Sequence, residues 1–272
     1  FGWGIAGAAY ATVLAQAVSA VLCFGYIAVK CRELIPHKED FVVQKEYYRK
    51  LISYGSSMAL MYTIVNIGSL ILQIGINGLG TDVVAAHITA RKISELFMMP
   101  GSTVAGALAT FTSQNYGAGF NDRIKNGVTI SCAVMLVWST IATLIVYLFG
   151  PYLVRMITGN VDQGIIDIAV RYLRINLPYY YALSALLLFR NALQGISHNG
   201  FTLVASIFEM LGKIITVAFF VKPFGYTAIC YSEPITWIIC CVPVTIALWH
   251  YLYAGSFEKP MLLRRISRKR SY

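Results

Sequence analysis

Charged side chains are scarce in this sequence. Only 12% of its 272 residues are Asp, Glu, Lys or Arg, whereas 57% are hydrophobic. A water-soluble globule of this size would have too little polar surface to coat its exterior. The mean hydropathy of +0.64 points the same way. The shortage of charge therefore argues against a soluble domain and predicts an all-α integral membrane protein.

Cysteine is also too sparse, and too poorly spaced, for a disulfide scaffold or a zinc site. There are six cysteines. Most fall inside apolar stretches, where cysteine behaves as a small buried hydrophobe. His87 has no second ligand at metal-binding spacing. We therefore predict neither a metal nor a cofactor.

The sequence also lacks the clusters that enzymes need. No nucleophile, base and orienting residue fall together, no phosphate-binding loop is present, and the pair Cys240–Cys241 has no neighbouring base. A membrane-embedded enzyme is therefore not expected.

What the sequence does contain is long uncharged runs. Each exceeds the roughly 20 residues that span a hydrocarbon core. Five spans follow from these runs alone: Phe1–Val29, Leu51–Thr81, Leu96–Asn121, Asn126–Val154 and Pro234–Phe257.

Two further spans are interrupted by charge. Ile175–Phe189 is bracketed by Arg174 and Arg190, whose long side chains we expect to snorkel to the interfaces. Thr202–Val221 carries only Glu209 and Lys213, and their i, i+4 spacing lets each partly neutralise the other. The total is about seven transmembrane helices.

Basic residues gather in alternate loops, which explains the net charge of +10 without a nucleic-acid partner. By the positive-inside rule, the loop after the first helix and the C-terminal tail are cytoplasmic, and the visible N-terminus lies outside. The residues are Lys30, Arg32, Lys38, Lys45, Arg49 and Lys50 in the loop, and Lys259, Arg264, Arg265, Arg268, Lys269 and Arg270 in the tail.

The only long hydrophilic connection separates the first helix from the rest. We predict a first helix within 1–30, a cytoplasmic linker at 31–50, six helices within 51–254 and a basic tail at 255–272. The six helices are expected at about 51–78, 85–113, 126–150, 170–191, 202–222 and 228–252. Because the chain starts inside an apolar helix and without Met, we expect it to be part of a longer protein.

Three short motifs carry a family resemblance. They are Gly4–Thr12, Gly80–His87 and Gln114–Gly119. In this order and spacing they resemble the multidrug and toxic compound extrusion (MATE) family, along essentially the whole chain.

The resemblance implies a fold of twelve helices in two six-helix lobes. It also implies exchange of cytoplasmic cationic or amphipathic compounds for incoming H+ or Na+. On that mapping the chain is the last helix of the N-terminal lobe followed by the C-terminal lobe, and the rest of the N-terminal lobe is its missing partner. A bacterial plasma membrane is the expected location.

Some positions depart from the family pattern. Val65 stands where the sodium-coupled branch carries a glutamate, and the tenth helix has no acid. Ser57 replaces a common proline. In relatives closer to this sequence the essential acid lies in the first helix, which this chain lacks.

Three acids fall within spans, where an ionisable residue is a functional candidate by default. Glu95 lies i+4 from Arg91 and i+3 from Lys92, and Glu209 lies i−4 from Lys213. Each has a structural ion pair as the alternative to ion coupling. Glu233 precedes Pro234, and we expect it near the outer interface.

Polarisable, aromatic and amide side chains offer a wall for flat cationic substrates. For any single one, packing or interhelical hydrogen bonding is the competing interpretation. The candidate substrate-binding residues are Met58, Met61, Tyr62, Asn66, Gln73, Met98 and Tyr180.

Other functions stay open at this point. A lipid or lipid-linked oligosaccharide flippase of the same superfamily would be favoured by a groove lined with several arginines. A receptor without transport activity would fit the count of seven helices, although truncation explains that count better. Export by alternating access is the favoured interpretation.

Overall fold

The computed structural model describes residues 3–37, 41, 45–159 and 162–253. Within these ranges the chain is almost entirely α-helical and has no strand, which confirms the predicted fold class. The predicted tail at 255–272 and positions 38–40 and 42–44 of the predicted linker lie outside the described residues.

The chain divides into two compact units, Phe1–Ser53 and Tyr54–Tyr272. The first holds α1 (Gly4–Lys30), a 3-10 turn at Arg32–Leu34 and the beginning of α2 (Lys45–Asn77). Helix α1 carries no charge before Lys30, so its composition suits a bilayer along its whole length.

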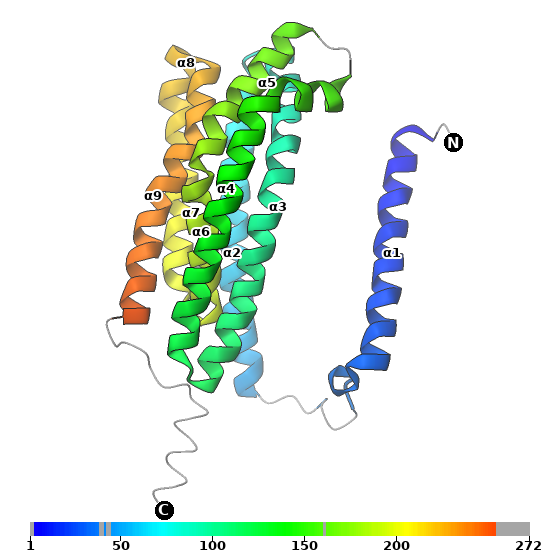
Figure 1. Ribbon diagram of the computed structural model, residues 1–272, viewed down its shortest axis with the longest axis vertical. Coiled ribbons are helices and arrows are strands. Elements are labelled where there is room, and N and C mark those ends of the chain that lie inside the picture. The colour runs from blue at the N-terminus through cyan, green and yellow to red at the C-terminus, as the bar shows by residue number, and fades with distance from the viewer. Residues whose placement is uncertain (1–2, 38–40, 42–44, 160–161, 254–272) are drawn as a thin grey trace, which may run out of the picture. The chain divides into compact units, whose positions relative to one another are not determined.

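The second unit is a bundle of helices that run alongside one another, with α5 and α8 toward the same end (Figure 1). Pro178 lies in a 3-10 turn that joins α5 to α6, and a π-helical turn at Thr216–Phe220 joins α7 to α8. After α2, its helices are α3 (Thr81–Ala118), α4 (Asn121–Thr158), α5 (Gln163–Asn176), α6 (Tyr180–Gly195), α7 (Asn199–Ile215), α8 (Val221–Phe224) and α9 (Tyr226–Tyr253).

Helices α2 and α5 begin well before the residues that their hydrophobicity predicted. Helix α2 starts at Lys45 rather than 51, and α5 starts at Gln163 rather than 170. The residues added to α2 include Lys45, Arg49 and Lys50, which are good helix formers, so charge marks the membrane boundary there without ending the helix. The side chain of Asp162 caps α5 by accepting a hydrogen bond from the backbone N–H of Gly164.

Within the described residues, five helical segments are long and apolar enough to cross a membrane. Helix α3 and the α5–α6 pair also run through the bundle but carry charges, and together with the five they account for the seven predicted spans. The five segments are Ala9–Lys30, Leu51–Asn77, Asn121–Thr158, Asn199–Phe224 and Tyr226–Leu252.

The core lies where α3, α6, α4 and α9 meet, and α3 packs most extensively against α6. Alanines let these backbones approach closely: Ala90, Ala105 and Ala192 are fully buried. Gly106 on α3, by contrast, faces open space.

Gly195 marks the tightest approach between α3 and α6. A Cβ at this position would stand 2.7 Å from the carbonyl oxygen of Ala109 and 2.9 Å from the Cβ of Thr112. A backbone oxygen cannot move aside as a flexible side chain does, so only glycine fits here.

We therefore expect Gly195→Ala to lower stability by about 1–3 kcal/mol, the usual cost of overpacking. Thermal unfolding of the purified protein in detergent measures this as a lower midpoint. The matched control is Gly106→Ala on α3, where nothing lies within 4 Å of the added methyl group. Equal midpoints for the two variants would contradict the close approach.

Candidate functional site

A cavity of about 300 Å³ lies inside the second unit. Six helices contribute to it: α2, α3, α5, α6, α7 and α9. Its lining combines ionised, aromatic and apolar side chains. Those used below are Met61, Tyr62, Ser69, Arg91, Glu95, Met98, Tyr172, Tyr180, Arg190, Glu209, Lys213, Glu233 and Trp237.

Helical spacing explains how each element delivers its residues. On α3, Arg91, Glu95 and Met98 recur at i, i+4 and i+7, which is one helix face. On α7, Glu209 and Lys213 share a face in the same way. The polar face of α7 points into the bundle, because Glu209 and Lys213 are both buried, and the polar face of α3 borders the cavity.

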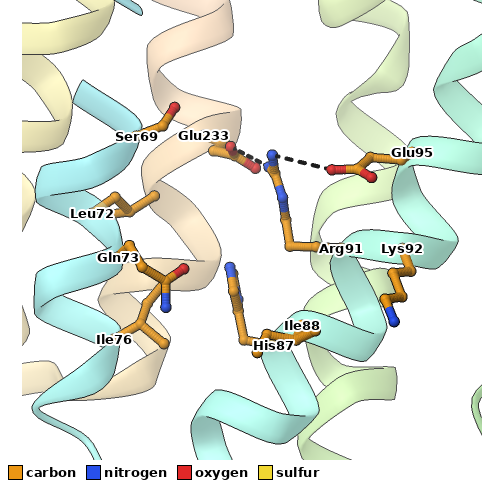
Figure 2. A pocket seen from close by; sticks show the side chains of 10 residues that line it. All are labelled: Ser69, Leu72, Gln73, Ile76, His87, Ile88, Arg91, Lys92, Glu95 and Glu233. Atoms are coloured by element: carbon orange, nitrogen blue, oxygen red, sulfur yellow. Dashed lines mark hydrogen bonds and ion pairs between the residues drawn. The ribbon is translucent and has the colours of Figure 1, made fainter. Parts of the chain in front are cut away.

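A second cavity of about 240 Å³ shares several of these residues and is shown in Figure 2. The guanidinium of Arg91 lies between the carboxylates of Glu233 on α9 and Glu95 on its own helix. Residues of α2, including Gln73, face it from the opposite side.

Glu233 holds the shortest ion pair of the site. Its Oε1 accepts from Arg91 Nη1 at 2.6 Å, and its Oε2 accepts from the hydroxyl of Tyr172, also at 2.6 Å. The carboxylate side chain is only 9% exposed. Helix α9 continues through Pro234, which places the carboxylate inside the bundle. The expected depth of Glu233 near the outer interface stays a prediction.

Aromatic and imidazole groups support this pair. His87 Nδ1 lies 3.1 Å from the hydroxyl of Tyr226, and its ring packs edge-on against Tyr172 with centroids 4.9 Å apart. His87 therefore helps to hold the tyrosine that donates to Glu233, which is a structural role.

Glu95 differs from the other two acids. Its nearest Arg91 nitrogen is 3.9 Å away, and its side chain is 61% exposed. Lys92 also lies on α3, but Figure 2 shows its amine directed away from Glu95. The predicted Arg91–Glu95 pair exists, yet it is long and solvated, so it contributes little stability.

Glu209 is shared by two cations. Its Oε1 accepts from Lys213 Nζ at 3.1 Å, as the i, i+4 spacing predicted, and its Oε2 accepts from Arg190 Nη2 at 3.2 Å. Lys213 also donates to the hydroxyl of Ser69 on α2, at 3.2 Å. The expectation that Arg190 snorkels to the interface was wrong, because the carboxylate of Glu209 holds its guanidinium inside the protein.

An aromatic and thioether wall lies beside these charges. The rings of Tyr180 and Trp237 meet edge-to-face with centroids 5.9 Å apart, and the hydroxyl of Tyr180 donates to the carbonyl of Ser94 at 3.0 Å. Met98 lines the same cavity, and Met61 does so from α2. Such a wall suits flat amphipathic molecules.

The predicted substrate residues separate into three groups. Met61, Tyr62, Met98 and Tyr180 line the main cavity, and Gln73 lines the adjoining one. Met58 and Asn66 line neither of these two cavities, and the amide of Asn66 donates to the carbonyl of Tyr62 on its own helix. Glu95, Glu209 and Glu233 all line the main cavity.

Sequence reasoning missed Tyr172 and Trp237, and it gave Arg190 a different role. Tyr172 is 61 residues from the glutamate that it contacts, so no local spacing could connect them. For Arg190 a signal existed: an arginine bordering a span that already holds an acid is a candidate ion-pair partner.

Solved structures with the same architecture are membrane transporters. An outward-facing multidrug resistance MATE family transporter of the MOP superfamily superposes with a TM-score of 0.81 at 20% identity, covering 95% of this chain and 58% of that one. A MOP superfamily transporter from Pyrococcus furiosus gives 0.80 at 20% identity, covering 93% of this chain and 57% of that one. At such identities the likeness establishes the fold.

The sequence itself identifies the family. The MatE family profile matches residues 57–219, which is more than half of the chain. The chain belongs to the MATE transporter family, as its three motifs predicted.

Two curated relatives are similar over part of their length. The probable multidrug resistance protein YpnP of Bacillus subtilis is 22% identical over 60% of this chain and 36% of its own. An FAD transporter of Shewanella oneidensis is 22% identical over 79% of this chain and 47% of its own. The chain thus spans less than half the length of both.

Glu233 and Glu95 both pair with Arg91, but we expect their removal to change the stability of the protein by different amounts. Glu233→Gln should destabilise the protein by about 2 kcal/mol, because it leaves Arg91 without its close partner in a desolvated site. Glu95→Gln should change stability by less than about 0.5 kcal/mol, since that carboxylate is largely solvated. Thermal unfolding of both variants in detergent provides the comparison, and equal losses would contradict the assigned geometry.

Proposed function

We propose that the protein is a secondary active exporter that moves cationic or amphipathic compounds in exchange for H+ or Na+ by alternating access. This chain supplies one wall of the central pathway. The observation that carries the proposal is the cavity in the second unit, where three acids lie beside an aromatic and thioether wall.

The free-energy cost of burying ionised groups in a membrane span supports a transport role for these residues. An ionised group within a span costs roughly 2.5 kcal/mol or more, so such residues usually line a pathway or bind what passes along it. Five of the cavity's ionised groups form ion pairs with one another, in two clusters, with Glu209 shared between two cations. Glu95 is the exception, since it is exposed and only loosely paired.

Glu95 is therefore our proposed contact for a cationic substrate. Its carboxylate reaches the cavity together with Met98 and Tyr62, which offer polarisable and aromatic surface to a flat cation. The relative from Bacillus subtilis is a probable multidrug resistance protein, which supports this substrate class.

Glu209 and Glu233 are the proposed coupling candidates. Both are buried and hydrogen-bonded to side chains from other helices, so a change in their protonation or partners would act on how those helices pack. The transport experiment described below distinguishes H+ from Na+ as the coupling ion.

The flippase alternative is not favoured. It calls for a groove with an excess of arginine, whereas Arg91 and Arg190 are each paired with a glutamate inside the cavity. The plasma membrane and a cytoplasmic C-terminus complete the proposal, on the basis of the positive-inside distribution.

Export is tested with everted membrane vesicles and ethidium as the probe. We expect uptake that stops when a protonophore or a sodium ionophore collapses the driving gradient, and the effective ionophore identifies the coupling ion. Glu95→Gln should lower the uptake rate about tenfold, the effect of losing about 1.4 kcal/mol of charge stabilisation.

The matched control is Asp122→Asn at the start of α4, where the carboxylate is 94% exposed and forms an ion pair with Lys125. It should transport at the normal rate. Uptake that neither ionophore affects would refute ion-coupled export.

Topology can be measured separately. A green fluorescent protein fused to the C-terminus should fluoresce, and alkaline phosphatase fused at the same point should be inactive, because the basic residues hold this end in the cytoplasm. The opposite pair of results would reverse the proposed orientation.

A further inference from the structure

The main cavity has two clusters of opposite formal charge. Arg91 with Glu95 and Glu233 sums to −1, from one cation and two anions. The Arg190–Glu209–Lys213 cluster sums to +1, from two cations and one anion. Both clusters line one continuous cavity, so a molecule inside it meets a negative and a positive region.

The positive cluster is the more deeply buried. The side chains of Arg190, Glu209 and Lys213 are 11%, 9% and 3% exposed. Each oxygen of Glu209 is taken by a different cation. The cluster therefore carries one positive charge more than its own acid neutralises, and the balancing negative charge lies in the Arg91 cluster of the same cavity. A charge with so distant a partner is costly in a low-dielectric interior.

Arg190 also has an unsatisfied hydrogen-bond donor. Its Nε is buried and makes no hydrogen bond within the described part of the chain. A buried donor without an acceptor costs roughly 1–3 kcal/mol, and a ligand that supplies the acceptor recovers this. The planar guanidinium is also suited to carboxylate geometry.

We propose that the Arg190–Glu209–Lys213 cluster binds a carboxylate of the transported compound, while Glu95 attracts its cationic group. This inference rests on the proposed function and narrows the substrate class to zwitterionic amphipaths. Tyr180 and Met98 supply the apolar wall of the same cavity.

A matched pair of probes tests the proposal. One is a cationic rhodamine dye with a free carboxylate, and the other is the methyl ester of that dye, which keeps the ring and the positive charge. Fluorescence polarisation with the whole purified protein in detergent measures both affinities. The free carboxylate should bind about tenfold more tightly, since one charge-assisted hydrogen bond contributes that much.

Two variants should move this preference in opposite directions. Arg190→Gln removes one positive charge and should reduce the preference to within about twofold. Glu209→Gln raises the formal charge of the cluster to +2 and should increase the preference for the free carboxylate. Unfolding alone weakens binding of both dyes, so it cannot produce opposite changes in their ratio.

A third variant serves as the control. Ser139→Ala alters a buried hydroxyl that pairs with Ser184 and does not line this cavity, so it should leave the ratio unchanged.

Equal affinity of the wild-type protein for the two dyes would overturn the inference. That result is expected if an acidic side chain from elsewhere in the protein already occupies the cluster. Vesicle transport of the ester without any preference in binding would leave the proposed export standing and remove only the carboxylate site. A tenfold preference for the free carboxylate without ion-coupled transport would support the carboxylate site and refute the proposed export.

Discussion

The second unit depends on one constraint: charges placed inside an apolar bundle must find partners there. The Arg91–Glu233 pair meets this constraint by joining α3 to α9, with Tyr172 of α5 completing the coordination of the carboxylate. Glu209 does the same for α6 and α7, and Lys213 extends the contact to Ser69 on α2. Because unpaired charges are unfavourable inside the bundle, these side chains determine which helices pack against one another.

The same constraint shapes the cavity. Apolar packing alone would close the space between these helices, but ionised groups need room and polar neighbours. The result is a pocket with charge at two places and an aromatic wall between helices, which is typical of small-molecule sites.

The fold was largely predictable from sequence, because uncharged runs of more than twenty residues have few alternatives to a membrane helix. The Glu209–Lys213 pair was also predictable, since i, i+4 spacing is a local property. Glu233 was not: its partner Arg91 lies 142 positions away, and the helix ran through a proline that suggested a boundary. The start of α5 was missed because Asp167 interrupts the apolar residues before position 170.

The close approach at Gly195 has a mechanical consequence. With no space for even a methyl group between α6 and the backbone of α3, neither helix can rotate about its axis without carrying the other. Arg91 lies on one of these helices and Arg190 on the other, so this contact links the two helices that carry the guanidinium groups of the cavity. On the proposed function, a compound that reaches both charged clusters must match the distance between these helices, so its length matters as well as its charge.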